Sequence, residues 1–128
     1  MKIDHIGIAV KSLAAAKIYE TLGLTVDHVE EVATQGVKTA FLRAGEASLE
    51  LLEPLSPESP VAKFIARRGE GIHHICFRVT NLESHLERLK KAGYRLINES
   101  PVPGAHGCRV AFLHPTAGNG VLIELSEK

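Results

Sequence analysis

Residues 70–79, Glu-Gly-Ile-His-His-Ile-Cys-Phe-Arg-Val, form the stretch around which the chain is organised. After the paired histidines, apolar residues alternate with other types, which predicts a β-strand over residues 74–79. A similar stretch, Asp-His-Ile-Gly-Ile-Ala-Val, lies at residues 4–10. We interpret His5 and His74 as equivalent residues of two half-domains and predict that both face one metal ion.

Further short matches follow these two stretches in the same order along the chain. They pair Val-Lys-Ser-Leu at 10–13 with Val-Thr-Asn-Leu at 79–82, Ala-Phe-Leu at 40–42 with the same tripeptide at 111–113, and Leu-Glu-Leu at 49–51 with Ile-Glu-Leu at 123–125. One three-residue match would be weak, but four matches in order indicate a tandem duplication.

Each half predicts the element order β-α-β-β-β. In the first half we expect strands over 3–10, 24–32, 37–43 and 47–53, with a helix that Ser12 caps and Gly23 ends. In the second half we expect strands over 74–79, 94–98, 109–114 and 121–126, with a helix over 82–92 that Asn81 caps and Gly93 ends. Between them, a helix starts near Ser59 with Pro60 at its first position and stops at Gly69.

This order predicts an α+β fold in which two tandem β-α-β-β-β modules form a curved mixed sheet around a metal site. We expect a single domain over residues 1–128. Module 1 covers about 1–54, the linker helix about 55–71 and module 2 about 72–128. A chain of 128 residues is long enough to bury roughly two-thirds of its unfolded surface in one core.

The composition is that of an ordinary globular protein, with 45% apolar and 23% charged residues. Fifteen basic and fifteen acidic residues give no net charge, which argues against bulk attraction to nucleic acid or to a membrane. No apolar run approaches the ~20 residues of a membrane span. The charged start of the chain does not resemble a signal peptide, and Cys76 and Cys108 form no disulfide or zinc-finger pattern. We therefore expect a cytoplasmic protein.

Strand alternation places one histidine and one glutamate of each half on the face opposite its aliphatic residues. Glu50 alternates with leucines, and Glu124 alternates with Val, Ile and Leu. A carboxylate in such a strand is costly to bury unless it is paired or binds a metal. Two imidazoles and two carboxylates suit a divalent first-row metal. We therefore predict that His5, Glu50, His74 and Glu124 ligate one ion.

Each of these residues has an ordinary structural alternative when it is taken alone. A histidine at a strand start is most often only hydrogen-bonded, and a glutamate in a strand most often lies on a solvated edge. His73 has the opposite parity from His74, so we assign it a structural role. Cys76 shares the parity of His74, and we expect a small wall residue there rather than a thiolate ligand. The duplicated His and Glu pattern favours the metal site.

The chain resembles the methylmalonyl-CoA epimerase family of the vicinal oxygen chelate superfamily, which also includes glyoxalase I and the extradiol dioxygenases. The resemblance covers nearly the whole chain. The segments that carry it are Ile-Asp-His-Ile-Gly-Ile-Ala-Val at 3–10, Glu-Leu-Leu-Glu-Pro-Leu at 50–55, Ser-Pro-Val-Ala-Lys-Phe at 59–64, Gly-Ile-His-His-Ile at 71–75, Phe-Leu-His-Pro at 112–115 and Gly-Val-Leu-Ile-Glu-Leu at 120–125.

This resemblance implies epimerisation of (R)- and (S)-methylmalonyl-CoA through a metal-stabilised enolate. It implies metal ligation by His5, Glu50, His74 and Glu124, with cobalt as the first expectation and manganese, nickel or zinc as alternatives. It also implies an acyl-CoA substrate and a homodimer. A glyoxalase I-type lactoylglutathione lyase is the alternative, because it uses the same ligands, and a non-catalytic small-molecule binding protein of the same fold is a third reading.

Inverting a stereocentre needs two proton-transfer groups, one on each side of the carbon. Glu124 is the first candidate, as a carboxylate beside the metal. Some members of the family carry a glutamate just after the Gln-Gly-Val segment, and here Thr39 occupies the matching position. Because a threonine is a poor base, the second role falls to Glu50 or to another group, and Glu50 is our choice.

Overall fold

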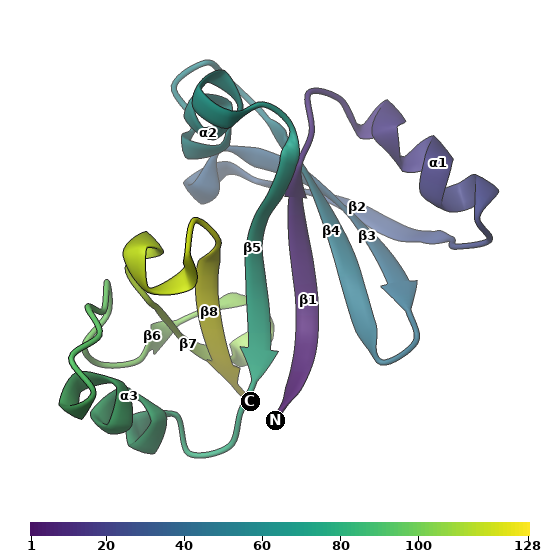
Figure 1. Ribbon diagram of the computed structural model, residues 1–128. Helices are drawn as coiled ribbons and strands as arrows, with labels where there is room; N and C mark the ends of the chain where they lie inside the picture. The colour runs from purple at the N-terminus through teal and green to yellow at the C-terminus, as the bar shows by residue number, and fades with distance from the viewer. The chain divides into compact units, whose positions relative to one another are not determined.

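All residues 1–128 are described in the computed structural model, and they divide into two compact units. Residues 5–73 make up the first unit, and residues 1–4 with residues 74–128 make up the second. Each unit combines a four-stranded mixed sheet with helices, so the α+β class and the two modules predicted from the sequence are confirmed (Figure 1).

The sheet of the first unit has the strand order β2-β3-β4-β1. Its strands are β1 (Lys2–Ala9), of which residues 5–9 belong to this unit, β2 (Val26–Val32), β3 (Val37–Ala44) and β4 (Ala47–Pro54). Strands β1 and β4 are parallel, whereas β4 with β3 and β3 with β2 are antiparallel. A 3-10 turn, η1 (Leu13–Ala15), leads into α1 (Ala16–Thr21), η2 (Ala33–Gln35) joins β2 to β3, and α2 (Pro60–Arg68) follows β4.

Two apolar clusters cover opposite faces of this sheet. Leu51 belongs to the cluster on the side of α1, together with Val10, Ala16, Ala40 and Leu42. Its neighbour Leu52 belongs to the cluster on the side of α2, together with Ala9, Val37, Val61 and Phe64. Because adjacent strand residues point to opposite faces, α1 and α2 lie on opposite sides of the sheet (Figure 1).

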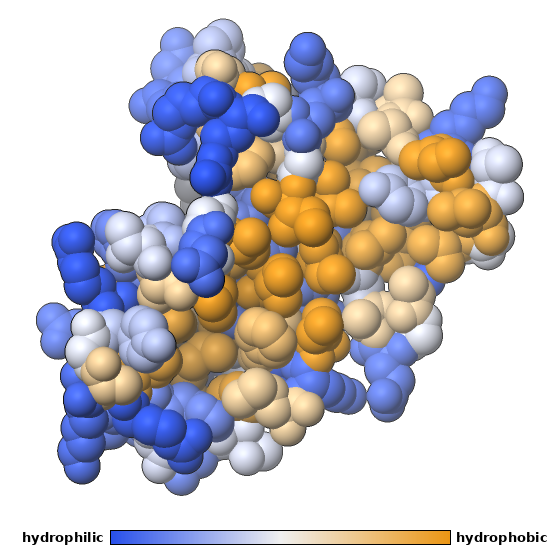
Figure 2. All heavy atoms as spheres, viewed as in Figure 1, coloured by the Kyte–Doolittle hydropathy of each residue, from blue (hydrophilic) through white to orange (hydrophobic).

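The outer side of α1 is apolar as well. Ile18 and Leu22 are 60% and 73% exposed, and Figure 2 shows apolar side chains gathered over α1 at the right of the view. These two residues do not contribute to the buried clusters of the first unit.

The sheet of the second unit has the order β5-β8-β7-β6, again with one parallel pair, β5 with β8. Its strands are β5 (Gly71–Arg78), β6 (Val102–Pro103), β7 (Arg109–Phe112) and β8 (Leu122–Glu127). Helix α3 (Leu82–Lys91) follows β5, and the short turns η3 (Ala105–Gly107) and η4 (Pro115–Gly118) flank β7. The core joins the sheet to α3 through Val79, Leu82, Leu86, Ala111, Leu113 and Leu125.

Helix α2 begins as the sequence predicted. The Ser59 side chain accepts a hydrogen bond from the backbone N–H of Ala62 at 3.0 Å, Pro60 is the first helical residue, and Gly69 closes the helix with φ 79°. A proline lacks the N–H that a first-turn position would leave without an intrahelical partner, which explains its place there.

The predicted cap at Asn81 is correct in position but wrong in mechanism. Asn81 has left-handed backbone angles (φ 58°), and its side chain makes no capping hydrogen bond. The Glu127 carboxylate accepts hydrogen bonds from the backbone N–H groups of Asn81 (2.7 Å) and Leu82 (3.4 Å) instead. In the first unit, the Glu53 carboxylate likewise accepts from Leu13 N–H at 2.8 Å. Each unit thus caps its first helical turn with a glutamate from its own last strand.

The strand predicted over residues 94–98 is wrong. The structure has only a single bridge there, between Leu96 and Leu113. The Asn98 side chain takes the place of a backbone acceptor, because its Oδ1 accepts from the N–H of Phe112 at 2.8 Å. The second strand of this unit is instead the two-residue β6, which pairs with β7. None of the three α-helices combines the length and apolar character needed to cross a bilayer.

Candidate active site

In the first unit, a histidine and a glutamate meet on neighbouring parallel strands. The register of β1 with β4 pairs Gly7 with Glu50 and His5 with Ser48. His5 Nδ1 lies 3.3 Å from Glu50 Oε2, and the two side chains are 13% and 19% exposed. Across the antiparallel pairing of β3 with β4, Glu50 faces Phe41. The carboxylate is thus held mostly out of water but remains reachable.

The second unit repeats this arrangement. The register of β5 with β8 pairs Cys76 with Glu124, and β7 places Phe112 opposite the same glutamate. His74 Nε2 lies 3.9 Å from Glu124 Oε1, with side chains 11% and 13% exposed. In both units the glutamate lies between the residue two positions after the histidine and a phenylalanine. The equivalence of the two halves therefore extends to the strand register around the predicted ligands.

The donor atoms in each pair have the spacing that a shared metal ion needs. Nitrogen and oxygen ligands lie about 2.0–2.2 Å from a first-row divalent ion, so two of them on one ion are roughly 3–4 Å apart. The distances of 3.3 Å and 3.9 Å fall in this range. A His and Glu donor set suits such an ion by its chemistry as well. Both pairs therefore fit the metal that the sequence predicts.

Comparison with known proteins identifies the family of the chain. Residues 4–112 match the family model of the glyoxalase/bleomycin resistance protein/dioxygenase superfamily. The ethylmalonyl-CoA/methylmalonyl-CoA epimerase of Cereibacter sphaeroides is 40% identical over 98% of this chain and 97% of its own length. The chain belongs to the methylmalonyl-CoA epimerase family.

Two further relatives support the assignment. The human mitochondrial methylmalonyl-CoA epimerase is 39% identical over 98% of this chain and 73% of its own length. A solved structure of the Streptomyces coelicolor methylmalonyl-CoA epimerase, in complex with 2-nitronate-propionyl-CoA, is 38% identical with a TM-score of 0.87, covering 100% of this chain and 94% of the other. The resemblance and fold class expected from the sequence are confirmed.

The other histidine of the epimerase-family signature, His73, lies against helix α2. Its ring makes an edge-on contact with Phe64, with centroids 4.9 Å apart. Burial lowers the pKa of His73, because the charged form loses its hydration. A neutral ring packed on an aromatic one agrees with the structural role predicted for His73.

Thr39 is buried, with 3% of its surface exposed. It lies on β3 and pairs with Leu52 of β4 and Glu30 of β2. A neutral hydroxyl is a poor base near neutral pH, so Thr39 is not suited to removing a proton from carbon. Two positions further along β3, Phe41 faces Glu50 of β4.

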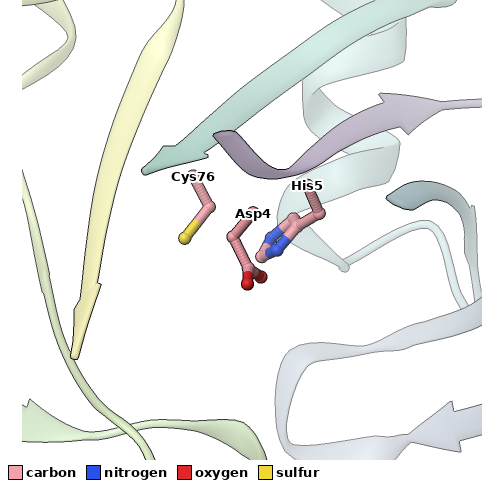
Figure 3. Close-up of side chains that lie close together, drawn as sticks. All are labelled: Asp4, His5 and Cys76. Carbon is pink, nitrogen blue, oxygen red and sulfur yellow. The ribbon is translucent and has the colours of Figure 1, made fainter. Parts of the chain in front are cut away.

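Sequence reasoning missed two contacts near the predicted ligands. The ring of His28 stacks on Phe41 with centroids 4.2 Å apart and an angle of 12°. Arg78 Nη2 donates to Asp4 Oδ1 at 2.7 Å within the second unit. Figure 3 shows Asp4 together with Cys76 and with His5, the residue that follows Asp4 on β1. No pattern in the sequence signals either contact, because both depend on strand pairing.

The remaining histidines lie in loops or on α3. His114 precedes η4, and its Nδ1 accepts a hydrogen bond from Thr116 N–H at 3.3 Å. His106 is exposed and has left-handed backbone angles (φ 57°). Neither belongs to the two His and Glu pairs, and no role in the chemistry is assigned to them.

Proposed function

We propose that the protein interconverts (R)- and (S)-methylmalonyl-CoA. The observation that carries the proposal is the duplicated His and Glu pair, with matching strand register in both units, in a member of the methylmalonyl-CoA epimerase family. The reaction removes the acidic proton from the carbon between the thioester and the carboxylate and returns a proton to the opposite side.

We further propose that His5, Glu50, His74 and Glu124 hold one divalent metal ion. The 3.3 Å and 3.9 Å donor spacings and the mixed nitrogen and oxygen chemistry support this set. When bound, the ion supplies a Lewis acid that stabilises negative charge on the substrate oxygens. Cobalt is our first choice, and manganese, nickel and zinc fit the same donors.

The proton transfers belong to the two glutamates. A carboxylate that is 13% exposed, as Glu124 is, gives up little hydration when substrate covers it, and it can take up or return a proton at Oε1 or Oε2. Glu50 is the second group, on the other unit, with a comparable exposure of 19%. The burial and lack of charge of Thr39 favour Glu50 over that position.

The histidines keep the carboxylates in place. His5 Nδ1 lies 3.3 Å from Glu50 Oε2, and His74 Nε2 lies 3.9 Å from Glu124 Oε1, so each ring supports one oxygen of a carboxylate. Phe41 is the cross-strand partner of Glu50, and Phe112 is that of Glu124. Each phenylalanine limits the approach of water to the neighbouring carboxylate.

The experiment that tests this function is solvent proton exchange in heavy water. Metal-loaded protein should exchange the α-proton of methylmalonyl-CoA and equilibrate its two epimers, and a chelator should abolish both. If the protein isomerises a methylglyoxal–glutathione adduct instead, it is a glyoxalase I-type lyase. If it does neither but binds an acyl-CoA, it is a binding protein. Full activity without metal would contradict the mechanism.

Substrate preference, assembly and location are separate proposals. Assay of ethylmalonyl-CoA beside methylmalonyl-CoA measures the acyl preference, a comparison suggested by the name of the Cereibacter sphaeroides relative. We propose a homodimer in the cytoplasm, with the two modules and the linker helix acting as one domain. Sedimentation equilibrium, cell fractionation and unfolding followed in both modules test these points.

A further inference from the structure

The ion pair of Asp4 with Arg78 lies next to His5, one of the predicted ligands, and it has no role in the proton transfers proposed above. Arg78 Nη2 donates to Asp4 Oδ1 at 2.7 Å, and the two side chains are 28% and 29% exposed. This partial burial sets the pair apart from Lys90 with Glu87, whose acidic partner is 66% exposed. An ion pair that is partly shielded from water acts on its surroundings more strongly than an exposed one.

Asp4 immediately precedes His5, and its carboxylate lies within 4.8 Å of a ring nitrogen of His5 and of the sulfur of Cys76 (Figure 3). Cys76 is fully buried and is the strand partner of Glu124. The Asp4 charge is therefore close to one predicted ligand and to the neighbour of another. At such distances a carboxylate affects the binding of a cation without ligating it.

Arg78 is the cation that pairs with Asp4. It lies on β5, on the same strand face as His74 and Cys76 because residues two apart share a face. Its Nη2 is bonded to Asp4, whereas its Nε is buried and has no hydrogen-bond partner. A buried N–H without a partner is costly, so the position of this guanidinium needs an explanation other than its own stability.

We propose that Asp4 and Arg78 form a positioning pair that sets the metal affinity of the neighbouring His and Glu ligands. Asp4 strengthens binding through its negative charge beside His5, and Arg78 weakens it by holding and partly neutralising that carboxylate. Together, the two charges give the site an intermediate affinity for the metal ion. This inference rests on the metal-dependent function proposed above.

The proposal predicts effects of opposite sign for the two partners. In Asp4→Asn, the negative charge beside His5 is lost, and metal affinity falls by about tenfold. This is the lower end of the range seen when a residue that supports a metal ligand is removed. In Arg78→Met, the Asp4 carboxylate is no longer neutralised, and metal affinity rises several-fold. A change of this size is expected for an interaction between two charges that water partly screens. The double variant returns close to wild type. All differences shrink as salt is raised, because salt screens charges.

The test is titration of the metal-free full chain with Co²⁺, followed by its visible absorption and by calorimetry, at low and high salt. Lys90→Met is the matched control, because it removes one charge from an ion pair on α3 and leaves metal affinity unchanged. Circular dichroism of each metal-free variant checks that the sheet is intact, and Asp4→Glu restores binding if the charge is what matters.

Two failures are distinguishable. If both single variants weaken Co²⁺ binding equally, or neither changes it while wild type binds, the pair has only a structural role and this inference is overturned. If wild type itself binds no divalent ion, the metal-dependent function fails, and this inference fails with it.

Discussion

His5 Nδ1 lies 3.3 Å from Glu50 Oε2, and the two residues come from parallel strands that are not consecutive in the chain. The register that brings them together pairs Glu50 with Gly7, two residues beyond the histidine. His74 and Glu124 have the same relationship in the second unit, with Cys76 in the place of Gly7. The site is thus assembled twice by one rule of strand pairing.

Substitutions of the paired histidines of β5 test the proposed metal binding separately from packing. We expect His74→Ala and His5→Ala to weaken divalent-ion binding by more than about 100-fold, because each removes a ligand rather than a supporting residue. His73→Ala should leave ion affinity unchanged and lower the thermal midpoint, because it removes the contact with Phe64. Calorimetric titration and thermal unfolding measure the two effects. Equal loss of metal binding in His73→Ala would contradict the assignment of His74 by strand parity.

Glutamine in place of either glutamate keeps a ligand oxygen but loses the carboxylate that takes up a proton. Glu124→Gln should lower α-proton exchange by about 10²–10⁴-fold, the usual range for an acid-base group. Glu50→Gln keeps a ligand oxygen, so we expect it to bind metal normally yet to stop interconverting the epimers. Exchange measured separately from each epimer identifies which face each glutamate serves. Unchanged epimerisation in Glu50→Gln would move the second role to another residue.

Glu53 links β4 to the first helical turn through its hydrogen bond from Leu13 N–H. Glu53→Ala removes this acceptor and should lower the free energy of unfolding by about 1 kcal/mol, the usual cost of a lost helix cap. Glu53→Gln, which retains an acceptor oxygen, should cost less. Urea denaturation of the metal-free chain measures both, and equal losses would show that the charge matters rather than the hydrogen bond.

The ion pairs of Arg109 make the free energy of unfolding depend on pH in the acid range. It donates to Glu83 at 2.7 Å and 2.9 Å and also contacts Glu127, and these bonds lower the pKa of both carboxyl groups. Carboxyl groups with a lowered pKa in the folded state stabilise it above their ordinary value near 4.5, and this stabilisation is lost as pH falls through the folded pKa. Arg109→Met should flatten the fall in the urea midpoint below pH 4.5. An unchanged slope would contradict the role of this network.

Gly36 and Gly45 share the same backbone angle, φ 67°, but differ in their surroundings. A Cβ at Gly36 would lie 2.9 Å from the Ser59 Cβ, whereas a Cβ at Gly45 meets nothing within 4 Å. Gly45→Ala should cost about 1 kcal/mol, for the left-handed backbone alone. Gly36→Ala should cost about 1 kcal/mol more, because Ser59 must also move away from the start of α2. Denaturant midpoints of the two variants, compared directly, measure the difference.

Local patterns in the sequence were sufficient for the duplicated modules and for most element boundaries. The alternation in β1, β4, β5 and β8 follows from the two-residue period of a strand, and it placed the histidines and glutamates on one face. Ser59 and Pro60 marked the start of α2 by local chemistry alone. These features depend on residues close together in the chain.

Where a distant residue could replace a local partner, the sequence predictions were wrong. The cap of α3 is Glu127 rather than the Asn81 side chain, because a carboxylate from β8 reaches the first turn. The strand expected over 94–98 is absent, because the Asn98 side chain bonds Phe112 where a backbone carbonyl would have been needed. Neither distant partner can be found by a pattern that spans only a few residues.

The histidine pair in residues 70–79 was sufficient by itself to predict His74 rather than His73 as a ligand, because strand parity is a local property of the backbone. It could not show that Glu124 would lie 3.9 Å from His74, that Cys76 would lie beside Glu124, or that Arg78 would bond Asp4. Those contacts join residues of different strands, and only the register of the folded sheet decides which of them meet. The sequence thus determined which residues can serve the chemistry, and the tertiary structure decided their partners.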